Sequence, residues 1–209
     1  MLDKRDVALQ SLTPVMMVPK FTDLDVLQNA GHRFLMASDG LWMEVKRSWL
    51  ELCVPIAQQH IVPMPYGSLE RKVEFSFSAL PVDYLKQFVE EAKRNLPYEC
   101  AGGFIGAEGT QNVRFAMCFA NEANSDFITY ECPELEDDEY MIADIHSHGS
   151  APAFFSSTDN EDDKTEVKIA VVVGNVDTTP TMKTRLCANG YFIDLPSYNF
   201  ESKGDDYDA

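Results

Sequence analysis

Two histidines and an aspartate in the second half of the chain have the types and the spacing of a metal site. His146 and His148 are separated by one residue, and Asp159 follows in the next turn. The apolar residues before His146 predict the end of a buried strand, and residues i and i+2 of a strand point to the same face. Two imidazole nitrogens and one carboxylate oxygen leave the fourth position around a zinc ion open, which is typical of catalytic zinc. A closed structural site needs a fourth ligand, usually a thiolate, and the sequence has no Cys-x-x-Cys pair.

The simpler explanation is that these histidines are ordinary core or surface residues, because short motifs often match by chance. However, two of the four histidines in the chain share a single tripeptide. This concentration favours metal ligands at His146 and His148. His32 and His60 stand alone, and we interpret them as structural.

The motif His-x-His-x(7)-Ser-x(2)-Asp resembles that of the JAMM (MPN-plus) metalloisopeptidases, and His146, His148, Ser156 and Asp159 match its fixed positions. That family also has a glutamate near the end of a helix and before a strand that contains glycine. The resemblance assigns this position to Glu99. It implies that the histidines and the aspartate hold zinc, and that the glutamate moves protons. The serine hydroxyl could donate a hydrogen bond to a developing oxyanion.

The resemblance covers about residues 78–195, and Phe154-Phe155-Ser156 is most similar to the version found in PRTRC gene clusters of bacterial plasmids. It implies a zinc-dependent isopeptidase or peptidase that hydrolyses an amide bond at the C-terminal tail of a ubiquitin-like protein. PRTRC clusters also encode a ThiF-like activating enzyme, so both proteins are expected partners. The alternative is a non-catalytic MPN scaffold or interaction module.

Two other catalytic arrangements compete with the zinc hypothesis. Serine, histidine and aspartate are all present, as in Ser-His-Asp hydrolases, but the chain has no Gly-x-Ser-x-Gly elbow. Cys100 lies beside Glu99 and could be a nucleophile. A lone cysteine in a strand is more often a buried and inert thiol.

The charge of the chain bears on its partners. The formal net charge is -17, with 34 acidic against 17 basic residues. Direct nucleic-acid binding is therefore disfavoured, because phosphate contacts are made by lysine and arginine. Acidic runs at residues 134–139 and 161–163 flank the motif. They are either solvated loops that keep the protein soluble or a negative field that attracts a basic substrate tail.

The sequence also bears on location. No apolar run approaches the ~20 residues that a membrane span needs, so we expect no membrane association. The first residues are followed by no apolar segment typical of a signal peptide. Five cysteines are scattered singly, and an odd number without paired spacing favours a reducing compartment. We therefore expect a cytoplasmic protein.

We predict four regions along the chain: residues 1–70 as a small, mostly β segment of unknown role, 71–77 as a linker, 78–197 as the JAMM/MPN metalloprotease domain, and 198–209 as an acidic tail. In the first region, residues 21–31 predict a short helix that ends at a glycine. Ser38-Asp39-Gly40 predicts a hairpin, and residues 49–54 a third strand.

In the domain predicted at residues 78–197, apolar residues at helical spacing predict a helix over 81–96, which Pro97 ends. Strands are expected at residues 113–120, 140–146 and 167–173. Asn189-Gly190 predicts a further hairpin. The expected fold class is α/β, with a cytidine-deaminase-like MPN domain whose curved mixed sheet is flanked by helices, preceded by the β segment.

Overall fold

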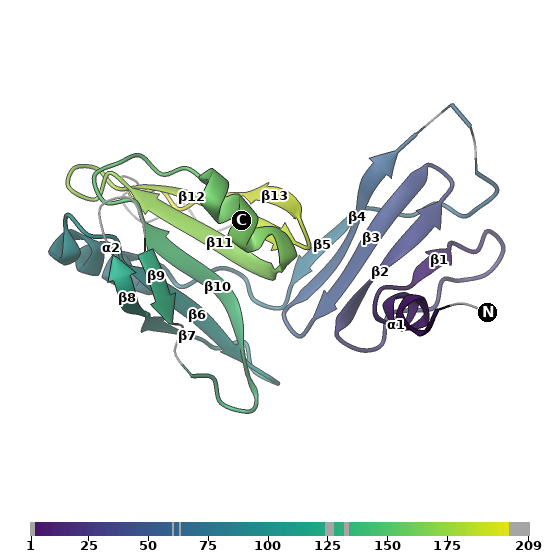
Figure 1. Cartoon of the computed structure of the whole chain (residues 1–209), viewed down its shortest axis with the longest axis horizontal. Helices are drawn as coiled ribbons and strands as arrows, with labels where there is room; N and C mark the ends of the chain where they lie inside the picture. Colours follow the sequence, from purple (N-terminus) through teal and green to yellow (C-terminus); the bar gives the residue numbers. More distant parts are fainter. Residues whose placement is uncertain (1–2, 60, 63, 124–127, 132–133, 201–209) are drawn as a thin grey trace. The chain divides into compact units, whose positions relative to one another are not determined.

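The computed structural model of the protein describes residues 3–59, 61–62, 64–123, 128–131 and 134–200. The chain forms two compact units, Met1–Ser78 and Ala79–Ala209, each with its own large sheet (Figure 1). A small β-rich unit thus precedes a mixed α/β unit, which confirms the predicted fold class. Most of the predicted acidic tail lies outside the described residues. No helix within the described ranges is long and apolar enough to cross a membrane.

The first unit is a five-stranded sheet in the order β1-β2-β3-β4-β5. β1 runs parallel to β2, and the other neighbours are antiparallel. Alternate residues of β2 are buried, as expected for a strand with one face on a core. The predicted hairpin and third strand are confirmed. The strands are β1 (Val15–Met17), β2 (Gly31–Ala37), β3 (Gly40–Arg47), β4 (Leu50–Gln58) and β5 (Lys72–Phe75).

The helix predicted over residues 21–31 is wrong. Residues 21–30 form a connection without regular structure, in which Leu24 packs against the core of the sheet. The carbonyl oxygen of Asp25 accepts a hydrogen bond of 2.5 Å from Nη2 of the buried Arg33. These tertiary contacts hold the segment in a non-helical course, and its last residue, Gly31, begins β2.

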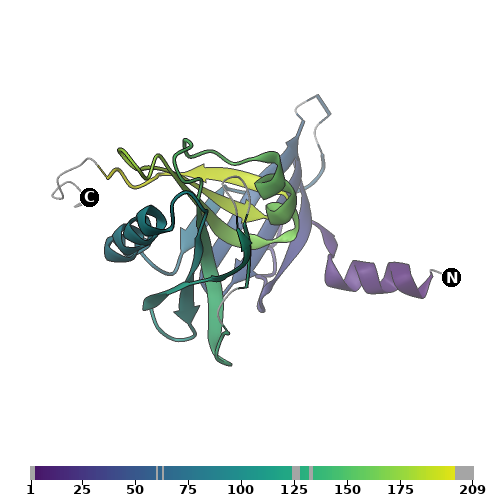
Figure 2. The same ribbon diagram turned by 60° about the vertical axis from the view of Figure 1, so that its left-hand side comes forward.

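The helix of this unit is instead α1 (Lys4–Leu12), which the sequence analysis missed. Its N-cap is Asp3, whose side chain accepts a hydrogen bond from the backbone of Arg5. None of its residues is buried, and Figure 2 shows it extending away from the strands. An apolar pattern therefore could not have revealed it.

The linker predicted at residues 71–77 is also corrected, because β5 lies within it. β5 pairs with β4, and the ring of Phe75 stacks on Trp49 with 6.2 Å between ring centroids. An aromatic core contact and a strand ladder thus keep this segment in the first unit.

The second unit is a six-stranded mixed sheet in the order β13-β12-β11-β10-β6-β7. β10 and β11 are parallel, and the other neighbours are antiparallel. The strand predicted at 140–146 lies in β10, at the centre. The strands are β6 (Ala101–Ala107), β7 (Val113–Met117), β10 (Glu139–Ser147), β11 (Val167–Gly174), β12 (Thr181–Ala188) and β13 (Tyr191–Leu195), and a separate ribbon holds β8 (Phe119–Ala123) and β9 (Ile128–Glu131).

The predicted hairpin between β12 and β13 is confirmed. Asn189 and Gly190 both have positive φ angles, 47° and 86°. A two-residue turn with this backbone matches the twist of the two strands that it joins, and asparagine and glycine tolerate it best.

The two faces of this sheet carry different helices. α2 (Val82–Asn95), predicted from its apolar spacing, packs Phe88 on Phe115, which in turn packs on Phe104. Phe104 pairs with Ala143 of β10. Because strand side chains alternate, the even-numbered residues at the end of β10, Asp144 and His146, point to the opposite face. That face carries α3 (Ser157–Asp162) and the short 3-10 helix η1 (Asp163–Thr165).

Candidate metal centre

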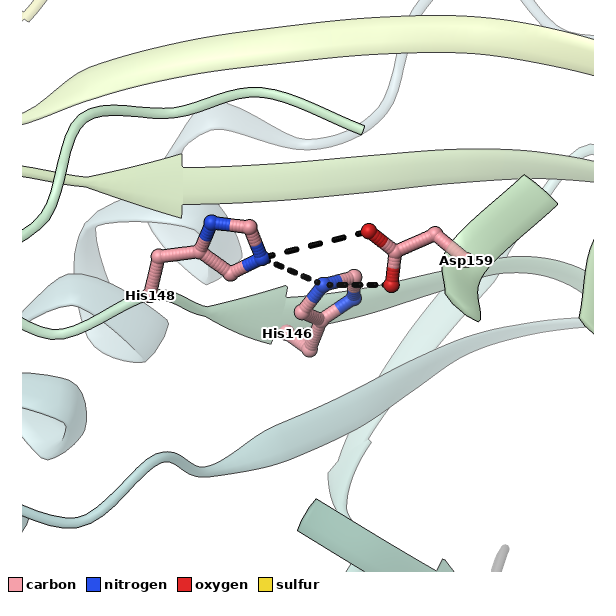
Figure 3. Close-up of side chains that lie close together, drawn as sticks. All are labelled: His146, His148 and Asp159. Carbon is pink, nitrogen blue, oxygen red and sulfur yellow. Dashed lines mark hydrogen bonds and ion pairs between the residues drawn. The ribbon is translucent and has the colours of Figure 1, made fainter. Parts of the chain in front are cut away.

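The end of β10 positions the two histidines. His146 pairs with Val172 of β11 on one side and with Ala101 of β6 on the other. His148 lies directly after the strand, where its backbone N–H donates to the carbonyl oxygen of Val173 at 2.8 Å. The two imidazoles project toward one point, with 3.2 Å between their Nε2 atoms (Figure 3).

The start of α3 positions the aspartate. Ser156 is the N-cap, and its Oγ accepts a hydrogen bond from the Asp159 backbone N–H at 3.1 Å. Oδ2 of Asp159 accepts one from the Ser156 backbone N–H at 2.6 Å, which completes a capping box. The carboxylate lies 3.3 Å from Nε2 of His146 and 4.0 Å from Nε2 of His148 (Figure 3).

The geometry of these three residues suits zinc. Their donor atoms all lie within 4.8 Å of one another. Each ligand of a tetrahedral zinc ion is about 2.0–2.2 Å from the metal, so two ligands are about 3.3–3.6 Å apart. The 3.2 Å between the two Nε2 atoms and the 3.3 Å from Nε2 of His146 to Oδ1 of Asp159 are close to this spacing. The 4.0 Å from Nε2 of His148 is to the other oxygen, Oδ2, so His148 and Asp159 must approach more closely to bind one ion through a single oxygen. Nitrogen and carboxylate oxygen are also donors that zinc prefers.

The electrostatic surroundings keep the aspartate ionised. Burial alone would raise the pKa of Asp159, but hydrogen bonds and charge from His146 and Ser156 outweigh it and lower that pKa. Burial would lower the pKa of His146, but the carboxylates of Asp159, Asp144 and Glu99 outweigh it and raise that pKa. An ionised carboxylate beside the imidazoles is the charge state that a divalent cation requires.

His148 differs from His146. Burial and the neighbouring His146 lower its pKa, which favours the neutral ring. The ring also makes a hydrogen bond to the backbone of Pro152. Its Nε2 faces His146 and Asp159, and in the neutral ring this nitrogen can offer its lone pair to a metal.

Glu99 lies two residues before β6, the strand that neighbours β10. Cys100 and Ser147 pair closely: the Ser147 backbone N–H donates to the Cys100 carbonyl at 2.9 Å, and the Cys100 N–H to the Ser147 Oγ at 3.1 Å. Glu99 directly precedes Cys100 and His148 directly follows Ser147, so both extend from the same end of this pair. The side chain of Glu99 is buried, and its charge acts on His146. The structure thus brings Glu99 to the same edge of the sheet as the three candidate ligands.

Comparison with known families finds a match in each unit. Residues 81–187, just over half of the chain, match the family of prokaryotic homologs of the JAB domain. The chain belongs to this family. The JAB/MPN family expected from the histidine motif is therefore confirmed. Residues 3–76 match a domain of unknown function, DUF2016, so the unit that precedes the JAB domain has a family of its own.

Comparison with solved structures and with curated proteins gives no further information on function. The solution structure of a protein from Desulfitobacterium hafniense is similar with a TM-score of 0.43 and 15% sequence identity. The similarity covers 54% of this chain and 86% of that one. No curated protein matches the chain. The function of this JAB domain must therefore be inferred from its site.

Cys100 of the JAB domain is not suited to be a nucleophile. Its side chain is buried, with Sγ 3.7 Å from Oγ of Ser147. Burial raises the pKa of the thiol to about 11, although the hydrogen bond with Ser147 acts in the opposite direction. The reactive thiolate is therefore scarce at neutral pH.

An ion network that was not predicted from the sequence lies beside the site. Lys168 of β11 lies 2.6 Å from Asp144 and 2.8 Å from Asp163, and Arg185 of β12 lies 2.6 Å from Asp163. Single charged residues inside apolar strands could have signalled it, because a buried charge needs a partner. The residues of the acidic run 161–163 therefore differ in their surroundings. Asp163 is buried and belongs to the ion network, whereas Glu161 and Asp162 are exposed.

Proposed function

We propose that the JAB domain is a zinc-dependent peptidase or isopeptidase that hydrolyses an amide bond at the C-terminal tail of a ubiquitin-like protein. The observation that carries this proposal is the convergence of His146, His148 and Asp159, whose donor atoms lie within 4.8 Å of one another. Three protein ligands leave a fourth position for water or substrate, as in catalytic zinc sites.

The residues around this site have complementary tasks in amide hydrolysis. Zinc, when bound there, supplies a Lewis acid that polarises a carbonyl and lowers the pKa of water from about 15.7 to about 7. Glu99 accepts the proton of the attacking water and delivers it to the nitrogen of the leaving amine, since one carboxyl group can do both in turn. Oγ of Ser156 accepts a hydrogen bond from the Asp159 backbone, and its hydroxyl could turn from the Asp159 carboxylate to donate to the substrate carbonyl oxygen.

The substrate class follows from the resemblance to the PRTRC version of the motif and from the charge near the site. A flexible tail with small residues would let the scissile carbonyl reach the site. Glu161 and Asp162 of α3 are exposed and would attract a basic residue upstream in such a tail. Cleavage of a basic tail peptide should then slow as salt rises, because charge attraction beyond ~8 Å is screened at physiological salt. Indifference to salt would mean that these carboxylates are only solvated.

A ThiF-like activating enzyme is the second proposed partner, since it would act on the same ubiquitin-like tail. The proposed location is the cytoplasm. The four cysteines within the described ranges are free thiols, in keeping with a reducing compartment: Cys53, Cys100, Cys118 and Cys187.

The test combines metal analysis with a cleavage assay. Purified protein should carry one zinc ion per chain, and alanine at His146, His148 or Asp159 should abolish it, whereas His32→Ala in the first unit should not. The protein should cleave the ubiquitin-like partner, and a chelator should stop cleavage. Metal-free wild type, or variants with unchanged zinc, would refute the site. Partner binding without cleavage, unaffected by chelator, would indicate a non-catalytic MPN scaffold.

A further inference from the structure

Helix α3, which carries Asp159, is not held in place by an apolar face of its own; just before it, the ring of Phe154 contacts that of His148 with 4.7 Å between centroids. α3 has six residues, and none of them is buried. So short a helix is marginal by itself, because most helical stability in proteins comes from packing of an apolar face. Polar contacts with the sheet must therefore position it.

Arg185 of β12 makes contacts on both sides of this segment. Its Nη1 donates to Oδ1 of Asn160 at 2.5 Å, and its Nη2 to Oδ2 of Asp163 at 2.6 Å. The guanidinium carbon lies 3.8 Å from the centre of the Phe155 ring. Phe155 directly precedes Ser156, and Asn160 directly follows Asp159. One rigid planar group thus contacts the residues that flank the capping box.

The guanidinium group is itself immobilised. A second ring, that of Phe192 on β13, lies 4.1 Å from its carbon atom. Arg185 is only 4% exposed. A buried cation in contact with two aromatic rings and two hydrogen-bond acceptors has little freedom to move.

Lys168 provides a second connection between the sheet and α3. Its Nζ lies 2.6 Å from Asp144 and 2.8 Å from Asp163. Asp144 stands two residues before His146, on the same face of β10. One ammonium group therefore joins the strand that carries the histidines to the segment that carries Asp159.

We infer that Arg185 and Lys168 are positioning residues that set the distance between Asp159 and the two histidines and thereby the affinity for zinc. This inference rests on the proposed zinc site. Neither residue touches the three donor atoms; each acts through the α3–η1 segment. Replacing a group that orients a metal ligand but does not bind the metal itself typically lowers metal affinity about 10–100-fold.

The test measures zinc affinity by competition with a chromogenic chelator. Arg185→Lys keeps the positive charge but replaces the planar fork, so it cannot bridge Asn160 and Asp163 as arginine does. We expect zinc binding to weaken by about tenfold or more. The absorption spectrum of the cobalt-substituted protein should change as well, because it reports ligand geometry and not global stability.

Asn160→Ala provides a second variant that should fold, since this side chain is at the surface and alanine favours helix. It removes one arm of the bridge, so a smaller loss of zinc affinity is expected. Thr158→Ala is the matched control: it is a neutral, exposed position on the same helix and should bind zinc like the wild type.

The outcomes separate this inference from the proposed function. Wild-type zinc affinity in both Arg185→Lys and Asn160→Ala would overturn it, even if the variants unfolded at lower temperature, because the network would then be structural only. If Arg185→Lys fails to fold, the zinc affinities of Asn160→Ala and Thr158→Ala are compared instead. Equal affinities would then overturn the inference. A wild-type protein that binds no zinc would overturn the proposed function and the inference together.

Discussion

Ser156 and Asp159 each donate their backbone N–H to the other's side chain, at 2.6 Å and 3.1 Å. The carboxylate that faces the two histidines is thus also part of a helix cap. Local folding at the start of α3 and the geometry of the candidate metal centre are therefore coupled. A change that weakens the cap should affect both.

Ser156→Ala tests this coupling. Loss of a serine N-cap costs about 1 kcal/mol of unfolding free energy. The Asp159 backbone N–H loses its acceptor, whereas the carboxylate keeps the bond from the backbone N–H of residue 156. The start of α3, and with it Asp159, should then be held less firmly, and zinc should bind more weakly. Urea unfolding of the metal-free protein and a zinc titration measure the two effects. Ser157→Ala, at the next and exposed position, should change the unfolding free energy by less than about 0.5 kcal/mol. Equal results for the two variants would contradict a role for the cap.

Glu99→Gln should keep zinc and lose turnover. It removes a proton acceptor but no predicted ligand, and general acid–base groups contribute about 10²–10⁴-fold to rate. The cleavage rate should fall by that order while the metal content stays at the wild-type level. Glu108→Gln, an exposed glutamate just beyond the other end of β6, serves as the control. Loss of zinc in Glu99→Gln would make Glu99 a ligand and our assignment of its role wrong.

Cys100→Ala should leave the cleavage rate close to that of the wild type. The thiol is buried and its pKa is raised to about 11, so little thiolate exists at neutral pH. For the same reason, alkylation of Cys100 by iodoacetamide should be slow in the folded protein and fast after unfolding in urea. An inactive Cys100→Ala that still folds and binds zinc would point to cysteine chemistry instead.

Glu139 should contribute to stability in a defined acidic range. The Arg114 guanidinium holds both its carboxylate oxygens, at 2.5 and 2.6 Å, and this pair, with the Glu136 backbone N–H, lowers the pKa of Glu139 to about 2. A folded-state pKa below the ordinary value of 4.5 means that the stabilisation is present above pH 4.5 and is lost as pH falls toward 2.

Urea unfolding of the metal-free protein at several pH values measures this effect. Between pH 4.5 and pH 2, the unfolding free energy of Glu139→Gln should fall less steeply than that of the wild type. Glu136→Gln keeps the backbone N–H and should follow the wild type. Parallel profiles for Glu139→Gln and wild type would show that the pair with Arg114 does not shift this pKa.

Elements with a strong local pattern were predictable from the sequence. α2 has buried residues at helical spacing, and the turn at Asn189-Gly190 specifies its hairpin. Elements without such a pattern were not. α1 buries nothing, so apolar periodicity could not reveal it, and residues 21–30 are kept out of a helix by contacts with distant strands.

The sequence by itself determined the candidate ligands, because His146, His148 and Asp159 are close in the chain and need only one strand end and one capped turn to meet. Only the tertiary structure decided their surroundings. Glu99 reaches the site because β6 pairs antiparallel with β10. Lys168 and Arg185 meet beside it because β12, β11 and β10 are neighbours and present these side chains on one face. Pairing between strands distant in sequence leaves no local pattern. The resemblance could point to Glu99, and lone charges in apolar strands could point to buried ion pairs, but neither could show which side chains meet.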